Sequence, residues 1–127
     1  MAEVHNTYTI KDDGQLSTVR IADEVVAVIA GLAATEVKGV ASLGGGITNS
    51  MVARKGIKAL SKGVKIVVNE DNEVKADLII NLTYGSSIPE VAREVQDRVS
   101  SAIESMTGMK VMDVNLRVTG IEADPEE

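Results

Sequence analysis

The strict alternation of apolar and polar residues over positions 74–84 is the feature that most constrains the fold. Every second residue from Val74 to Tyr84 is apolar, and most of the residues between them are polar. A period of two is typical of a strand with one buried face. A β-branched run at 64–68 comes just before, separated by the polar segment 70–73. The two runs therefore predict an antiparallel hairpin whose inner face packs against a core.

Two longer stretches repeat their apolar residues at helical spacing. The first, 22–37, carries acidic residues in its first turn and stops before Gly39. The second, 87–108, has Ser87 and Glu90 at the spacing of a capping box, Pro89 in its first turn, and Gly108 as its stop. The apolar stripe of this second helix is predicted to consist of Ile88, Val91, Val95, Val99, Ala102, Ile103 and Met106.

Short strands are expected at 16–21, 39–43 and 111–119, and a third, amphipathic element at 49–61. Together these elements predict a single α+β domain, a mainly antiparallel sheet with two long helices packed on one face, over residues 14–121. Residues 1–13 form an N-terminal arm, for which the weak alternation favours a flexible arm over a hairpin. Residues 122–127 are predicted to be a disordered acidic tail.

Several chemistries are excluded by what the sequence lacks. It contains no Cys, so there is no thiol nucleophile and no thiolate metal site, and its single His5 lies in the weakly patterned arm. The carboxylates fall in turns, strands and exposed helical faces, where nothing indicates a shifted pKa. We therefore expect no enzymatic activity, no metal and no cofactor. The N-terminus has no basic, apolar leader, and no run of about 18 apolar residues follows, so we expect a cytoplasmic protein without a membrane span.

The charges are segregated along the chain, although the net charge is −6. No acidic residue lies between Glu36 and Glu70, a stretch that holds six of the thirteen basic residues. Drawn as one helix, 49–61 places its cations on one side and its apolar residues on the other. The cations are Arg54, Lys55, Lys58 and Lys62, and the apolar residues are Val52, Ala53, Gly56, Ile57, Ala59 and Leu60. This element is either a partner-binding surface or an ordinary docked helix with a solvated basic face.

Two further groups of residues are candidate binding positions. The polar side of the predicted strands forms an outer sheet face, on which we expect partner contacts from Lys65, Lys75, Asn81, Thr83, Asn115 and Arg117. The run Gly44, Gly45 and Gly46 precedes a candidate helix, as in loops that bind anions, but it matches neither phosphate-loop pattern. A simple flexible connector is therefore the favoured interpretation of the three glycines.

The chain resembles the alkaline shock protein family of Gram-positive bacteria, also called envelope stress response proteins, over about residues 14–121. The likeness lies in the run RIADEVVAVIAGLAATEVKGV at 20–40 and in shorter segments of the second half. These segments are GVKIV at 63–67, YG at 84–85, IPEVA at 88–92, VQDRV at 95–99, MTG at 106–108 and VNLRVTG at 114–120. The basic part, 44–62, is the least similar to the family.

The resemblance implies a small cytosolic protein of the envelope stress response, without established enzymatic activity. Some relatives self-associate and are held at the membrane by a separate anchor protein, and others are linked to fatty-acid or acetyl-CoA carboxylase homeostasis. The favoured function is a non-enzymatic scaffold or adaptor in the cell-envelope or general stress response. Its partner would be a protein, either membrane-anchored or a second copy. A regulator of lipid synthesis and a small RNA-binding module stay open as alternatives, although the acidic net charge disfavours nucleic acid.

Overall fold

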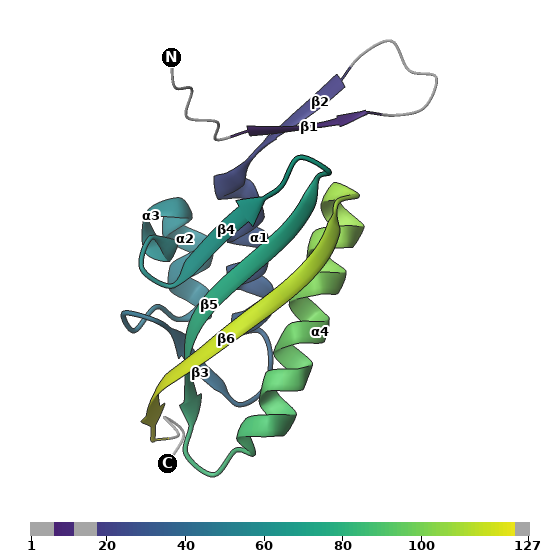
Figure 1. The fold of residues 1–127 in the computed structure, drawn as a ribbon. Coiled ribbons are helices and arrows are strands. Elements are labelled where there is room, and N and C mark those ends of the chain that lie inside the picture. Colours follow the sequence, from purple (N-terminus) through teal and green to yellow (C-terminus); the bar gives the residue numbers. More distant parts are fainter. Residues whose placement is uncertain (1–6, 12–17, 124–127) are drawn as a thin grey trace.

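The computed structural model describes residues 7–11 and 18–123, and it has the predicted α+β architecture (Figure 1). The chain forms, in order, β1 (Thr7–Lys11), β2 (Thr18–Ala22), α1 (Asp23–Thr35), β3 (Val40–Leu43), α2 (Asn49–Lys55), α3 (Ile57–Leu60), β4 (Val64–Val68), β5 (Glu73–Thr83), α4 (Ile88–Thr107) and β6 (Lys110–Glu122).

Strand β5 is the centre of the main sheet. Along one edge it pairs antiparallel with two strands, with β4 at residues 74–78 and with β3 at residues 80–82. Between them the N–H of Ile79 donates to the carbonyl of Gly63 at 2.9 Å, and its carbonyl accepts from the N–H of Gly44 at 2.7 Å. Strand β6 pairs with the other edge of β5 in parallel. This parallel pair follows from α4, which returns the chain to the starting end of β5 as a crossover connection.

The long helices α1 and α4 lie behind the sheet, and the opposite face of the sheet is turned toward the viewer in Figure 1. The core fills the space between these two layers. It contains the alternate residues Val74, Ala76, Leu78, Ile80 and Leu82 of β5, as the alternation predicts. Tyr84, predicted for the same face, is instead 79% exposed because it lies beyond the end of β5.

Helix α4 confirms most of its predicted stripe, with Val91, Val95, Val99 and Ile103 buried. Ile88 and Met106, at its two ends, are 47% and 69% exposed, so these two members of the predicted stripe are not buried. Gly108 ends the helix in the left-handed conformation, as predicted. Ser87 occupies the N-cap position but makes no side-chain capping hydrogen bond, so the predicted capping box is not formed.

Three boundary predictions were wrong. Residues 7–11 of the arm form β1, which pairs antiparallel with β2. The arm therefore forms the hairpin that was the less favoured interpretation of its weak alternation. The element 49–61 is not one helix, because Gly56 adopts φ +61° and ψ −130° and separates α2 from α3. Glu122, assigned to the acidic tail, is the last residue of β6 and pairs with Thr83. The remaining tail residues 124–127 lie outside the described part of the chain.

Candidate functional site

The outer face of the sheet is the side that α1 and α4 leave uncovered (Figure 1). The strand register places polar residues from three strands side by side on this face: Lys65 of β4 lies opposite Asp77, and Asp77 lies opposite Asn115 of β6. Arg117 lies in the next outward-facing row, opposite Ile79. The outer sheet face therefore brings together residues that are up to 52 positions apart in the sequence, from Lys65 to Arg117.

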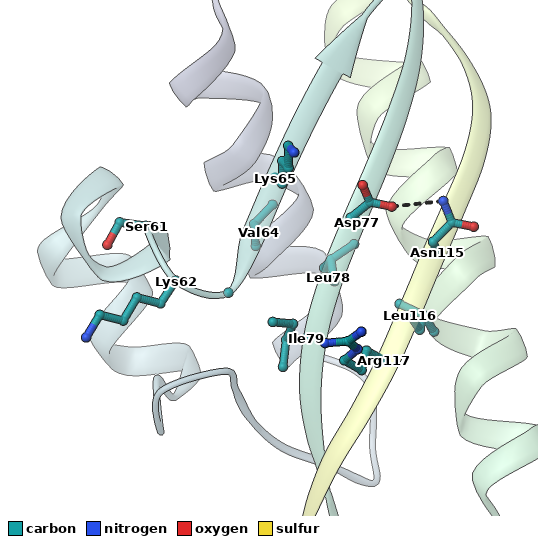
Figure 2. Close-up of a pocket in the computed structure, with 11 residues that line it drawn as sticks. Ser61, Lys62, Val64, Lys65, Asp77, Leu78, Ile79, Asn115, Leu116 and Arg117 are labelled. Carbon is teal, nitrogen blue, oxygen red and sulfur yellow. Dashed lines mark hydrogen bonds between the residues drawn. The ribbon is translucent and has the colours of Figure 1, made fainter.

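A concave hollow of about 570 Å³ lies on this face (Figure 2). We call it the basic hollow; its lining residues are Ser61, Lys62, Gly63, Val64, Lys65, Asp77, Leu78, Ile79, Asn115, Leu116 and Arg117. The hollow forms where β4 begins, next to the middle of β5 and β6. Figure 2 shows the Arg117 side chain lying across β5 beside Ile79, and Lys62 extending from the loop before β4.

The charge of the basic hollow is unbalanced. Lys62, Lys65 and Arg117 are exposed, and none of them forms a salt bridge with another described residue. The single carboxylate of the lining, Asp77, already accepts a 2.8 Å hydrogen bond from the side-chain amide of Asn115. Lys65 and Arg117 thus flank a hollow whose one carboxylate is engaged by a neutral donor, and Lys62 lies at its edge with its ammonium group directed away from β5 and β6 (Figure 2). A site of this charge attracts an anionic group.

A hydrogen-bond network fixes the other end of the outer face. The side-chain amide of Asn81 donates to the hydroxyl of Ser42 at 3.0 Å, and its carbonyl accepts from Thr119 at 3.1 Å. Ser42, which is 1% exposed, donates in turn to the carboxylate of Glu122 at 2.7 Å. Asn81 therefore ties β3, β5 and β6 together. Thr83, another predicted contact residue, is half-buried and pairs with Glu122.

The three glycines lie in the turn that follows β3, and two of them donate backbone hydrogen bonds. The N–H groups of Gly44 and Gly46 donate to the carbonyls of Ile79 and Leu43, so neither is available to an anion. A Cβ on Gly44 would lie 2.9 Å from Cγ2 of Ile79, which explains why this position needs glycine. Gly45 lines a second hollow of about 590 Å³, together with Ile47, Met51, Lys55, Ala59, Ser61 and Lys62. Anion binding at Gly44, Gly45 and Gly46 was a candidate beside the favoured connector, and these hydrogen bonds engage the N–H groups of two of the three glycines.

The cations predicted to lie on one helical face are divided by the break at Gly56. Arg54 and Lys55 lie in the last turn of α2 and are exposed, whereas Lys62 follows α3 and lines both hollows. The side chain of Lys58 lies outside the described part of the structure. Val52, Ala59 and Leu60 are buried as predicted, but Ala53 is exposed, because a helix of seven residues buries only one narrow side.

An apolar groove between α1 and α4 is a surface that the sequence reasoning missed. It has a volume of about 470 Å³ and is lined by Glu24, Val25, Val28, Ile29, Leu32, Ala33, Glu36, Ala102 and Met106. Val25 is 48% exposed on its rim. The sequence of α1 contains an indication of this groove, because no residue from Val25 to Ala34 is polar. A helix that is apolar on every side needs a packing partner on every side.

The described residues contain no group of three or more His, Cys, Asp or Glu side chains placed to hold a metal ion. None of their helices combines the length and the apolar character needed to cross a bilayer.

Comparison with solved structures finds the structure titled "MamM CTD C267S", and the alignment covers 77% of this chain and 95% of that chain. The TM-score is 0.48 and the sequence identity 15%. Comparison with curated sequences finds the uncharacterized protein YqhY of Bacillus subtilis, 38% identical over 113 residues, which are 89% of this chain and 83% of that protein. The uncharacterized protein Spy1535 of Streptococcus pyogenes is 37% identical, with 86% and 82% covered.

A family model described as "Asp23 family, cell envelope-related function" matches residues 11–123. The match spans the whole sheet, both long helices and the basic hollow. It agrees with the resemblance to alkaline shock proteins seen in the sequence. The chain therefore belongs to the Asp23 family, whose function is related to the cell envelope.

Proposed function

We propose that this protein is a non-enzymatic scaffold or adaptor that acts in the cell-envelope stress response by binding other proteins through its outer sheet face. The observation that carries the proposal is the basic hollow, whose lining contains the three cations Lys62, Lys65 and Arg117 and one carboxylate, Asp77, that is already hydrogen-bonded to Asn115. A polar, solvent-facing side of a sheet needs no such concentration of one charge for folding. The arrangement suits an acidic protein segment, which charge would steer to the site.

The proposal includes a place in the cell. The protein acts in the cytoplasm and reaches the membrane by binding a partner that is anchored there. The family's relation to the cell envelope supports this placement. Such a link would be salt-sensitive, because the cations that form it are exposed and screened by ions.

RNA is a weaker candidate for the same face. Single-stranded nucleic acid is usually bound by aromatic side chains on which bases stack. The chain has two Tyr and no Phe or Trp, and none of the residues lining the basic hollow is aromatic. We therefore expect no shift of a single-stranded RNA in a gel at physiological ionic strength. A role in lipid homeostasis is compatible with an adaptor, since the regulated enzyme would then be the bound protein.

Affinity capture from cells that naturally contain the protein, followed by quantitative mass spectrometry, tests the proposal. The bait carrying Lys62→Glu, Lys65→Glu and Arg117→Glu should lose the partners that the unchanged bait recovers. A second bait carries Arg54→Glu, Lys55→Glu, Lys58→Glu and Lys62→Glu. It tests whether the cations in and after α2 and α3 contribute to partner binding. The matched control is Arg93→Glu with Arg98→Glu on the exposed side of α4. Equal recovery by the hollow variant and the unchanged bait would remove the outer face from the proposal.

A further inference from the structure

We propose that the basic hollow binds the acidic segment 122–127 of a second copy, so that copies join head to tail. This inference deepens the proposed function by naming one partner of the hollow. It starts from the separation of charge within a single chain. The three cations of the hollow come from the stretch without acidic residues and from β6, whereas Glu122 ends β6 and Asp124, Glu126 and Glu127 follow it in the sequence.

The two surfaces are complementary in sign and similar in the number of charges. The hollow offers Lys62, Lys65 and Arg117, none of which has an ionic partner among the described residues. Beyond β6 the segment offers Asp124, Glu126 and Glu127, on either side of Pro125. Proline restricts its own φ and favours an extended backbone in the residue before it, so the segment loses less entropy when it binds than a flexible one would.

Geometry favours a second copy over the chain's own segment. Arg117 and Glu122 are five positions apart along β6, which corresponds to about 16 Å of strand. Glu122 is held at the strand end, because its carbonyl accepts a 2.8 Å hydrogen bond from the N–H of Tyr84 and its carboxylate accepts from Ser42. To reach Arg117 of its own chain, the part of the sequence after Glu122 would have to reverse direction, and a reversal itself uses at least about two residues. The acidic residues of a neighbouring copy have no such restriction.

The contact joins two different surfaces of the same molecule. A contact of this kind leaves one free hollow and one free segment at the ends of each assembly, so it propagates unless the copies close into a ring. Each ion pair is exposed and weak. Copies held in a row would in turn engage a multivalent partner more tightly than one copy can.

The first test measures binding of a fluorescent peptide that corresponds to residues 120–127. Anisotropy should show it binding to the full chain, with an affinity that falls by ~10-fold or more between about 50 and 300 mM salt. The Lys65→Glu/Arg117→Glu chain should bind it at least ~10-fold more weakly, and the Arg93→Glu chain should bind it as the unchanged chain does. A peptide with Asp124→Asn, Glu126→Gln and Glu127→Gln should not bind. Equal binding to all the chains, or none to the unchanged chain, would overturn the inference.

The second test asks for self-association of the whole protein by sedimentation velocity. The unchanged chain should sediment faster as its concentration rises, and the Asp124→Asn/Glu126→Gln/Glu127→Gln chain should stay monomeric. A chain with Asp124→Lys, Glu126→Lys and Glu127→Lys should associate with the Lys65→Glu/Arg117→Glu chain when the two are mixed, although neither associates alone. The peptide could instead bind a chain truncated after Glu122 but not the intact chain, while the intact chain does not associate. That result would mean that the segment binds its own hollow, and it would contradict the proposal.

The two proposals fail in different ways. Suppose that the Lys62→Glu/Lys65→Glu/Arg117→Glu bait loses captured proteins, but the Asp124→Asn/Glu126→Gln/Glu127→Gln chain associates like the unchanged chain. Head-to-tail binding is then wrong, and the adaptor proposal survives. If neither variant changes association or capture, both proposals are wrong.

Discussion

The hydroxyl of Ser42 in β3 donates a 2.7 Å hydrogen bond to the carboxylate of Glu122 at the end of β6, across the 80 residues that separate them in the sequence. The two residues lie on opposite sides of β5, and Asn81 of β5 also donates to Ser42. This contact fixes the point at which the acidic segment leaves the sheet.

The first prediction concerns the stability of this connection. Ser42→Ala should lower the free energy of unfolding by about 1–3 kcal/mol, because it removes two partly buried hydrogen bonds and leaves Asn81 with a weaker one. Urea unfolding followed by circular dichroism measures the change. Ser101→Ala, at an exposed position of α4, is the control and should change stability by less than about 0.5 kcal/mol. Equal effects of the two substitutions would show that the network contributes nothing.

The second prediction concerns the close approach of α1 and α3. A Cβ on Gly31 would lie 2.5 Å from Cδ2 of Leu60, which is 2% exposed and cannot move away freely. Gly31→Ala should therefore destabilise the protein by about 1–3 kcal/mol. In a Leu60→Ala background the same change should be neutral or stabilising, because the clash is gone and Ala favours a helix. The same loss in both backgrounds would contradict this explanation.

The third prediction compares two positions of the stripe that the sequence assigned to α4. Ile103 is fully buried, so Ile103→Ala should cost about 2–5 kcal/mol. Met106→Ala should cost less than about 1 kcal/mol, because that side chain is 69% exposed. Thermal or urea unfolding of both variants measures the difference. A large loss at Met106 would indicate that the groove between α1 and α4 is covered in solution.

The elements that local patterns specify were predicted well. The alternation of β5 and the helical period of α4 arise from one buried face each, so the sequence records them directly. The pairing of β6 with β5 was not predicted: its parallel direction follows from the α4 crossover, and its position depends on which edge of β5 remains free after β3 and β4 have paired. Likewise, the break at Gly56 depends on a positive φ that a helical wheel cannot represent.

The candidate site was only partly accessible from the sequence. Lys65, Asn115 and Arg117 could be assigned to an outer sheet face by alternation alone. Their meeting with Lys62 around one hollow depends on the register between β4, β5 and β6, which no local pattern contains. The apolar groove was missed for a similar reason, since it requires knowing which side of α1 faces the sheet.

The fourth prediction separates binding from folding at the basic hollow. Arg117→Glu should leave the free energy of unfolding within about 0.5 kcal/mol of the unchanged chain, because Arg117 is exposed and has no ionic partner among the described residues. It should nevertheless reduce partner capture. Asn115→Ala is the complementary variant, since it frees the carboxylate of Asp77 and should weaken binding of an acidic segment. Parallel loss of stability and binding in Arg117→Glu would indicate a structural role instead.

Site-specific photo-crosslinking in living cells tests most directly the claim that the outer sheet face is where this protein meets its partners. A photoreactive amino acid would replace Val67, a 45% exposed residue of the outer face paired with Lys75, in one strain and Arg93, on the exposed side of α4, in another. Mass spectrometry should find adducts at position 67 with acidic protein segments, residues 122–127 of a second copy among them, and few at position 93. Adducts that are absent at 67, or equally frequent at both positions, would contradict the account.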